Sequence, residues 1–434
     1  MNKPKVVAFL PAKGTSSRIE NKNVKLLDGK PLFLHTLEKL LQCTFIDEVY
    51  LDTEDDYLLD LASYLDFKVL KRDPELANNK TDGNQLFLNE VNYVDADIYI
   101  QILSTSPFIE TNTIQKGVET LIASDTYDSA FLTRNEKLYT WTDNKSDYDM
   151  NNIPNSFTLK DTTIETMGLY IVKRDTALAT KRRIGDNPFL LEASPLEAID
   201  VNYPEDFDLA NLIASGKREK ERKLLDNIKN QLTSSMLSDI LDDLVVSGTI
   251  LNYSLNLNNK KILGKAKTLK LRKLHENEDY KGIYGALHSY DTIIPNDIII
   301  VENEVPQFAY FGELNANLAI RSGASGAIIG GATRDTKEVI DLDFPVFAKG
   351  SSCKDVRKRA TLESYNKVIE IEGIKIAPND LIFGDCDGII VIPQKHEKEI
   401  IEKALKVLKK EKNILLDIAN NESIESIIKN NGFF

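Results

Sequence analysis

Apolar and polar positions in the first part of the chain follow two repeating patterns. An unbroken apolar run at Val6–Pro11 is typical of a strand that is buried on both faces. Further strands are predicted at Glu48–Thr53, Lys68–Leu70 and Ile98–Leu103, and leucines at helical spacing predict a helix over residues 32–41. Because strands alternate with helices, we expect a doubly wound, mostly parallel α/β sheet. Ligands of such sheets bind outside the carboxyl ends of the strands.

The pattern changes after a predicted helix at Glu205–Ala214. Gly216 is a candidate end of this helix. The mixed-charge run Lys217–Lys223 forms either a solvated linker or an exposed helix, and its charges at helical spacing favour the helix slightly. A chain of 434 residues is long enough for two or three domains. We therefore expect a first domain at residues 1–216, a linker or linking helix at 217–231, and a second domain at 232–434.

The second domain is predicted to be a smaller α/β unit with a helical tail. A strand is expected at Lys261–Leu271, and a glycine-flanked apolar strand at Ala327–Ile329 leads into Thr333–Asp335. The segment Phe383–Pro393 is predicted as a turn that enters a buried strand. An amphipathic helix is expected over Glu397–Lys410, and the residues after Lys412 also have helical spacing.

Composition narrows the class of protein. The net charge of −13 argues against non-specific binding of nucleic acid, which needs a basic surface. The chain contains no apolar run long enough for a membrane span and starts without the apolar segment of a signal peptide. Three scattered cysteines have neither disulfide nor metal spacing. We therefore expect a cytoplasmic protein with reduced thiols that binds neither membrane nor nucleic acid.

The loop after the first strand has the residues of a phosphate site. Gly14 and the small residues Thr15–Ser17 follow the strand, and Lys13, Arg18 and Lys22 surround them. Backbone N–H groups of such a loop face a phosphate, and the cations neutralise it. The alternative is an ordinary loop with solvated lysines.

This region resembles the N-terminal signature of the CMP-acylneuraminate (CMP-sialic acid) synthetases and their CMP-ulosonate relatives. The match is ungapped over Ala12–Asn23, and the motif L-x-G-K-P-L follows at Leu27–Leu32. Lys13 stands in place of the first arginine of the family, which keeps the charge and loses the bidentate fork. The resemblance extends over roughly residues 4–214.

Further matches lie downstream at Arg72–Ala77, Thr105–Pro107 and Gly168–Arg174, while Leu103 replaces the glutamine that precedes the T-S-P turn in the family. The resemblance implies CTP as a substrate. The nucleotide-binding residues that it implies are Lys13, Gly14, Ser16, Asn23, Arg72, Thr81 and Arg174.

The segment Ile199–Asp206 resembles the acidic element with which the family binds magnesium. Asp200 and Asn202 are the implied Mg²⁺ (or Mn²⁺) ligands, with Asn202 in place of the second aspartate. Asp206 is instead expected to interact with the dipole of the following helix. The implied reaction is attack of a sugar-acid hydroxyl on the α-phosphate of CTP with release of pyrophosphate. Lys13, Arg18 and Lys22 are the catalytic cations in this reading.

The second domain resembles the RraA-like family, which includes class II 4-hydroxy-4-methyl-2-oxoglutarate (pyruvate) aldolases, oxaloacetate decarboxylases and a regulator of ribonuclease E. Glu313 is followed by twenty residues and then by Arg334-Asp335, and a G-D-x-D-G turn lies at Gly384–Gly388. The resemblance covers roughly residues 232–395. It implies Glu313 and Arg334 as catalytic residues and Asp335 as the ligand of a divalent metal. The implied substrate-binding residues are Gly312, Glu313, Leu314, Asn315 and Arg334.

Two hypotheses follow from these resemblances. In the first, the chain is a bifunctional enzyme: its first half makes a CMP-activated 2-keto-3-deoxy sugar acid, and its second half is a metal-dependent aldolase acting on pyruvate or another 2-oxo acid. In the second, the chain is a CMP-sugar synthetase whose RraA-like domain serves oligomerisation or regulation by binding a protein. Dimers are usual in the first family and trimers in the second, so the resemblances imply a homo-oligomer, either a dimer, a trimer or a hexamer.

Overall fold

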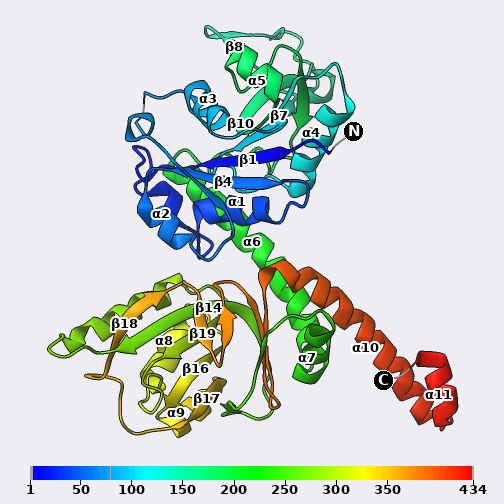
Figure 1. The fold of residues 1–434 in the computed structure, drawn as a ribbon. Helices are drawn as coiled ribbons and strands as arrows, with labels where there is room; N and C mark the ends of the chain where they lie inside the picture. The colour runs from blue at the N-terminus through cyan, green and yellow to red at the C-terminus, as the bar shows by residue number, and fades with distance from the viewer. Residues whose placement is uncertain (1–2, 79, 433–434) are drawn as a thin grey trace. The chain divides into compact units, whose positions relative to one another are not determined.

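The computed structural model describes residues 3–78 and 80–432, and the chain divides into two compact units, Met1–Ala214 and Ser215–Phe434 (Figure 1). Each unit has its own sheet and its own hydrophobic core. Among the helices of the described ranges, none combines the length and the apolar character that a membrane crossing requires.

The first unit is built on a seven-stranded sheet with the order β11-β7-β10-β6-β1-β4-β5. The neighbours β5, β4, β1 and β6 are all parallel, β10 is antiparallel to both β6 and β7, and β11 is parallel to β7. The strand bounds are β1 Val6–Pro11, β4 Glu48–Thr53, β5 Lys68–Lys71, β6 Ile98–Ile102, β7 Ser129–Glu136, β10 Thr162–Lys173 and β11 Pro188–Glu192. The predicted α/β fold class and its mostly parallel first sheet are therefore confirmed.

Helices of the first unit connect these strands. The helix bounds are α1 Leu32–Leu41, α2 Asp56–Leu61, α3 Gly83–Tyr93, α4 Thr111–Ala123 and α5 Arg174–Thr180. All six residues of β1 are buried, as expected for a central strand covered on both faces. Two short hairpins lie outside the sheet, β2 Leu26–Leu27 with β3 Lys30–Pro31, and β8 Trp141–Thr142 with β9 Lys145–Ser146. Single 3₁₀ turns occur at η1 Lys22–Val24, η2 Pro74–Leu76 and η3 Ser156–Thr158.

Helix α6 runs without a break from Pro204 to Lys229, so the expectation that Gly216 ends a helix is wrong. A glycine inside a helix costs only about 1 kcal/mol relative to alanine. Ion pairs at helical spacing lie on the following turns, where Arg222 contacts Glu219 at 2.7 Å and Asp226 at 2.5 Å. Of the two alternatives for the charged run after Gly216, the structure therefore has the helix.

The second unit contains a nine-stranded sheet with the path β12-β22-β21-β14-β15-β16-β17-β13, and β18 pairs with β14. The central strands β14, β15, β16 and β17 are parallel. The bounds are β12 Thr249–Ile250, β13 Ser254–Leu255, β14 Ile262–Lys273, β15 Ile298–Asn303, β16 Gly326–Thr333, β17 Val346–Ser351, β18 Ala360–Tyr365, β21 Leu381–Gly384 and β22 Ile389–Ile392; the separate hairpin is β19 Ile369–Ile371 with β20 Ile374–Ile376.

Helices of the second unit include α8, which begins directly after Gly312. The bounds are α7 Ser234–Asp243, η4 Tyr280–Thr292, α8 Glu313–Ser322, α9 Thr336–Asp341, η5 Gln394–His396, α10 Glu397–Ala419 and α11 Ile424–Asn431. Helix α10 extends nine residues beyond the predicted end at Lys410. Its first part packs against α7 through Ile400, Ala404 and Leu408, and α11 forms the helical tail.

Candidate functional site

Four parallel strands of the first unit end at the same edge of the sheet. The loop after β1 starts at Ala12, and the carboxyl ends of β4, β5 and β6 lie beside it in the strand register, where Pro11 pairs with Asp52 and Thr53 pairs with Lys71. Side chains that follow these strands can therefore share one site.

The loop Ala12–Asn23 is fixed to its neighbours by polar contacts. The Asn23 side chain donates from Nδ2 to the carbonyl oxygen of Lys13 at 2.8 Å, and its Oδ1 accepts from the Ser104 hydroxyl at 2.7 Å. The Ser16 hydroxyl accepts from the N–H of Ile19 at 3.4 Å. Asn23 thus connects the loop to the turn after β6, a structural task beside the binding role implied for it.

Gly14 lies against two acids that follow β4. Its N–H donates to Oε1 of Glu54 at 2.7 Å, and a Cβ on Gly14 would lie only 2.2 Å from Oδ2 of Asp55. A side chain at position 14 would therefore displace Asp55. The loop amide faces an anionic oxygen, which is the arrangement that a phosphate would use.

The cations of the loop converge on the acidic segment before α6. Lys22 donates from Nζ to the carbonyl oxygen of Val201 at 3.1 Å. The pKa of Lys22 is lowered to about 8, mainly by burial and then by the positive charges of Arg18 and Lys13, while Asp200 opposes this shift. Arg18 lies over the ring of Tyr203 at 5.4 Å. The structure thus brings Lys13, Arg18, Lys22 and Asp200 together.

The implied metal ligands are neighbours in the structure. Oδ2 of Asp200 accepts from Nδ2 of Asn202, whereas Oδ1 of Asp200 is buried without a hydrogen-bond partner. An orphaned carboxylate oxygen next to an asparagine side chain fits Mg²⁺, which takes oxygen ligands and keeps several waters. Asp206 instead accepts from the N–H groups of Asn202 at 3.0 Å and Tyr203 at 2.8 Å, so it holds the start of α6.

Arg72 reaches the same edge of the sheet because it directly follows β5. Its guanidinium is buried and donates from Nε to Oδ1 of Asp52 at 2.9 Å, and Nη1 lies 3.9 Å from Oε2 of Glu54. Thr81 lies in the segment before α3, where its N–H donates to Oδ1 of Asn78 at 3.0 Å. No contact of the described residues joins Thr81 to the loop after β1.

Arg174 lies at the opposite edge of the sheet. Strand β10 is antiparallel to β6, so its last residue, Lys173, pairs with Ile98 at the amino end of β6. The Arg174 guanidinium pairs there with Asp95 at 2.7 Å. The sequence pattern identified a strand that ends in a cation without revealing the direction of that strand, so the structure does not bring Arg174 to the loop.

The second unit assembles the residues around Arg334 by joining the end of β16 to the segment before α8. The N–H of Arg334 and the hydroxyl of Thr333 both donate to the carbonyl oxygen of Phe311, at 2.9 Å and 2.8 Å. This pairing places Arg334-Asp335 beside Gly312, where a Cβ would lie 2.5 Å from Oδ2 of Asp335 and 2.9 Å from Cγ of Arg334. Only a residue without a side chain fits at position 312 without a shift of these groups.

The charged groups of this site contact one another. Nη1 of Arg334 pairs with Oδ2 of Asp355 at 2.8 Å, and Nε lies 3.5 Å from Oδ2 of Asp335. The same Asp335 oxygen accepts from the N–H of Glu313 at 3.2 Å. Asp335 adopts a left-handed conformation with φ 51°, which is uncommon for a residue with a side chain.

The start of α8 faces this group. The first intrahelical bond runs from the N–H of Ala316 to the carbonyl oxygen of Gly312 at 3.0 Å, so the N–H groups of Leu314 and Asn315 precede the bonded part of the helix. The Asn315 side chain donates to the carbonyl oxygen of Tyr310 at 2.7 Å, and the Leu314 side chain is 74% exposed. Asp335 offers one half-exposed carboxylate, which fits a Mg²⁺ ion that is bound mainly by water and substrate.

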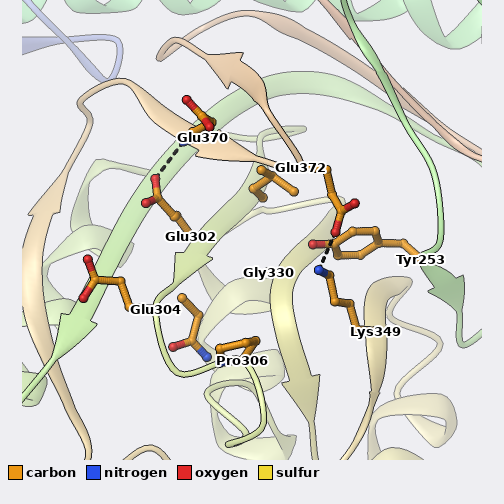
Figure 2. A pocket seen from close by; sticks show the side chains of 10 residues that line it. Tyr253, Glu302, Glu304, Pro306, Gly330, Lys349, Glu370 and Glu372 are labelled. Atoms are coloured by element: carbon orange, nitrogen blue, oxygen red, sulfur yellow. Dashed lines mark hydrogen bonds and ion pairs between the residues drawn. The ribbon is translucent and has the colours of Figure 1, made fainter.

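A separate pocket of about 250 Å³ lies between strand ends β15, β16 and β17 and the β19–β20 hairpin (Figure 2). Four of its ten lining residues are glutamates and one is a lysine; Glu302 accepts from the N–H of Glu370 at 2.7 Å, and Lys349 pairs with Glu372. None of the residues predicted for the second unit lines this pocket. Its carboxylates would repel an anionic 2-oxo acid, so the Arg334 region remains the better candidate.

Sequence reasoning missed Asp52, Glu54 and Asp355. Glu54 directly follows the end of β4, and this position in the sequence was a usable signal. Asp55 caps α2 by accepting from the N–H of Tyr57 at 2.8 Å. Asp355 lies in a charged segment after β17 and carries no pattern that could have identified it.

Comparison with known proteins finds two matching family models, a cytidylyltransferase model at residues 7–184 and an aldolase/RraA model at residues 234–391. The protein DlpA of Legionella pneumophila is 26% identical over 47% of this chain and 34% of its own length. This chain therefore spans about a third of that relative. The N-acylneuraminate cytidylyltransferase of Escherichia coli is 24% identical over 56% of this chain and 60% of its own length.

A protein of Halalkalibacterium halodurans, described as a candidate 4-hydroxy-4-methyl-2-oxoglutarate aldolase, is 30% identical over 40% of this chain and 79% of its own length. Among solved structures, a CMP:2-keto-3-deoxy-manno-octonic acid synthetase in complex with CTP has a TM-score of 0.39 at 19% identity, over 49% of this chain and 99% of that chain. An uncharacterised protein of Pseudomonas syringae has a TM-score of 0.42 at 23% identity, over 47% of this chain and 94% of that chain.

Proposed function

The chain belongs to the cytidylyltransferase family over residues 7–184 and to the aldolase/RraA family over residues 234–391. We propose that its first unit transfers CMP from CTP to a 2-keto-3-deoxy sugar acid. The observation that carries this proposal is the convergence of the Gly14 loop, Lys22 and the orphaned Asp200 oxygen at one sheet edge. A triphosphate needs such amides and cations, and an attacking sugar hydroxyl needs a neighbouring metal site.

In the proposed reaction, the hydroxyl oxygen of the sugar acid forms a bond to the α-phosphorus of CTP. The bond from that phosphorus to the bridging oxygen of the β-phosphate breaks, pyrophosphate leaves with the electron pair, and the hydroxyl proton passes to solvent. Lys13, Arg18 and Lys22 bind the phosphates and stabilise the charge of the leaving group. A Mg²⁺ ion held by Asp200 and Asn202 would supply further neutralisation of phosphate charge.

Product analysis of the full-length protein tests this proposal. We expect mass spectrometry to detect a CMP-linked sugar acid when CTP, Mg²⁺ and a panel of ulosonic acids are supplied. Lys22→Gln is expected to lower kcat/KM at least about a hundredfold, since it removes a cation from the reacting phosphates. Lys3→Gln is the matched control, because Lys3 pairs with Asp47 on the surface and is 64% exposed. Equal activity of both variants would contradict the assignment.

For the second unit we propose a lyase activity on a 4-hydroxy-2-oxo acid. The C4 hydroxyl gives its proton to solvent, and the bond between C3 and C4 breaks with its electron pair passing to C3. An aldehyde or ketone leaves, and the pyruvate enolate that remains takes up a proton from solvent. Arg334 would bind the substrate carboxylate and the enolate oxygen together with the N–H groups at the start of α8. A metal ion held by Asp335 would polarise the keto oxygen.

The alternative for the second unit is a binding module, and one contact favours it. The Arg334 guanidinium already pairs with Asp355 at 2.8 Å, so a substrate carboxylate must displace this partner. Assay of pyruvate release from 4-hydroxy-2-oxo acids with Mg²⁺ or Mn²⁺ separates the two ideas. Pyruvate release that is lost in Arg334→Gln and retained in Arg357→Gln supports the lyase activity. No pyruvate release by the wild type with any substrate supports the binding module.

A further inference from the structure

Four buried polar side chains lie beneath the carboxyl edge of the first sheet. They are Asp52 on β4, Arg72 after β5, Glu90 on α3 and Gln101 on β6. Each side chain is nearly inaccessible to solvent, with at most 4% of the residue exposed. Buried charges of this kind are retained only when hydrogen bonds or opposite charges compensate them.

Arg72 is held by Asp52 through two hydrogen bonds. Nε donates to the carboxylate Oδ1 at 2.9 Å, and Nη2 donates to the backbone carbonyl oxygen at 2.8 Å. The guanidinium is therefore fixed in orientation as well as in position. Its remaining nitrogen, Nη1, lies 3.9 Å from Oε2 of Glu54, whose other oxygen accepts from Gly14. Asp52 thus holds Arg72 next to the phosphate loop.

Glu90 continues this group into the core. Its Oε2 accepts from Nε2 of Gln101 at 2.7 Å, and its carboxyl group is within hydrogen-bonding reach of Asp52. The charged groups that face Glu90 are Asp52 and Arg72, while Gln101 is neutral. Two buried carboxylates therefore share one buried cation, and one negative charge is left over.

The carboxylate oxygens of Asp52 and Glu90 that make no hydrogen bond indicate the position of a proton. Oδ2 of Asp52 and Oε1 of Glu90 are both buried without a hydrogen-bond partner. Two ionised carboxylates cannot bond to each other, because both are acceptors. A single proton on Glu90 satisfies both oxygens and removes the excess charge. Burial, followed by the negative charge of Asp52, raises the pKa of Glu90 well above its usual range.

We propose that Glu90 is a protonated acid that donates a hydrogen bond from Oε1 to Oδ2 of Asp52, and that this acid pair positions Arg72 for binding of the nucleotide. The second part rests on the proposed cytidylyl transfer. Asp52 and Glu90 are positioning residues, since their side chains reach the ligand only through the guanidinium of Arg72. Gln101 completes the group by fixing the other oxygen of Glu90.

Infrared spectroscopy tests the proton directly and does not depend on enzymatic activity. The full-length protein is prepared with ¹³C-labelled glutamate side chains and measured at pH 8, where ordinary glutamates with a pKa of about 4.3 are ionised. We expect the carbonyl band of one protonated glutamic acid in the wild type, its loss in Glu90→Gln, and its retention in Glu370→Gln, which changes an exposed acid. A wild type without this band, or a band that persists in Glu90→Gln, would overturn the proposal.

Kinetics test the positioning role. The amide of Glu90→Gln can accept from Gln101 and donate to Asp52, so KM for CTP is expected to stay within about twofold of the wild type. Asp52→Asn and Glu90→Ala leave the pair incomplete, and both are expected to raise KM for CTP about tenfold or more with a smaller change in kcat. A Glu90→Gln variant that fails to fold, or that raises KM as much as Asp52→Asn, contradicts the proposal.

The two experiments separate failure of this inference from failure of the proposed function. If the wild type transfers no CMP to any acceptor, the proposed function and the proposed role of Arg72 in nucleotide binding are both contradicted. The infrared measurement still decides in that case whether Glu90 holds the proton.

Discussion

The N–H of Gly14 donates a hydrogen bond to Oε1 of Glu54 over 2.7 Å. A carboxylate therefore occupies the place at the loop amide where the proposed function requires a phosphate oxygen. Binding of a triphosphate must move Glu54 away or share the amide with it. This contact makes Glu54 an internal competitor of the nucleotide.

Removal of this competing charge is expected to strengthen nucleotide binding. We predict that Glu54→Gln lowers Kd for CTP by about three- to tenfold in calorimetric titration, because it removes an anion from the phosphate site. The control is Asp56→Asn, which changes an acid two positions away whose side chain is 89% exposed. A weaker affinity in Glu54→Gln would show that Glu54 assists binding of the nucleotide or its metal ion.

A methyl group at Gly312 is expected to disrupt the site of the second unit. The added Cβ would lie 2.5 Å from Oδ2 of Asp335, so Asp335 and Arg334 must shift. We predict that Gly312→Ala lowers the proposed lyase activity at least about tenfold, since small displacements of positioned groups are costly for catalysis. Gly285→Ala is the control within the same unit, because its Cβ would meet only the flexible side chain of Leu362 at 3.1 Å. Equal loss in both variants would point to a folding defect instead.

Gly216 offers a test of the continuous helix α6. Apart from the adjoining backbone of its own helix, no atom of the described residues lies within 4 Å of a Cβ at this position, so the added methyl group causes no clash. We predict that Gly216→Ala stabilises the protein by about 1 kcal/mol through helix propensity, measured as a rise in the thermal midpoint by circular dichroism. If the chain were a flexible linker at this point, the substitution would leave the midpoint unchanged.

His35 predicts a pH dependence of stability in the first unit. Burial and the positive charge of Lys30 lower the pKa of His35 to about 3 from an ordinary value of 6.5, and Nε2 lies 2.9 Å from the carbonyl oxygen of Leu27. The unfolded chain therefore takes up a proton below pH 6.5 that the folded protein does not. The stability contributed by neutral His35 is complete above pH 6.5 and is lost as the pH falls toward 3.

This loss amounts to about 2 kcal/mol between pH 6.5 and pH 5, at about 1.4 kcal/mol per pH unit. We predict that His35→Gln removes this slope in urea unfolding followed by the fluorescence of Trp141, the single tryptophan of the chain. His288→Gln is the control, since its side chain is 75% exposed in the second unit. An unchanged slope in His35→Gln would mean that His35 ionises in the folded protein.

Local patterns predicted the fold where burial alone determines the structure. Val6–Pro11 and Glu48–Thr53 form strands with the predicted bounds, because apolar runs between helices leave few alternatives. The end predicted at Gly216 was wrong, since a single glycine is a weak signal against the ion pairs on the following turns.

The sequence predicted which residues share a candidate site only where it also indicated the direction of the strands that carry them. The loop at Gly14 and the segment at Asp200 follow elements whose order the sequence indicates, and they meet in the structure. Arg174 directly follows the antiparallel strand β10, whose direction no local pattern encodes, and it lies at the far edge of the sheet. Asp52, Glu90 and Asp355 depend on side-chain pairing between distant segments, which becomes visible only in three dimensions.

The central claim is that the first unit uses CTP to activate a sugar acid. Its most direct test is pyrophosphate release by the full-length protein with CTP, UTP, GTP and ATP, each combined with Mg²⁺ and a set of ulosonic acids. We predict release that requires both CTP and one acceptor of this class. Release with another nucleotide in preference to CTP, or silence with every pair, would contradict the account.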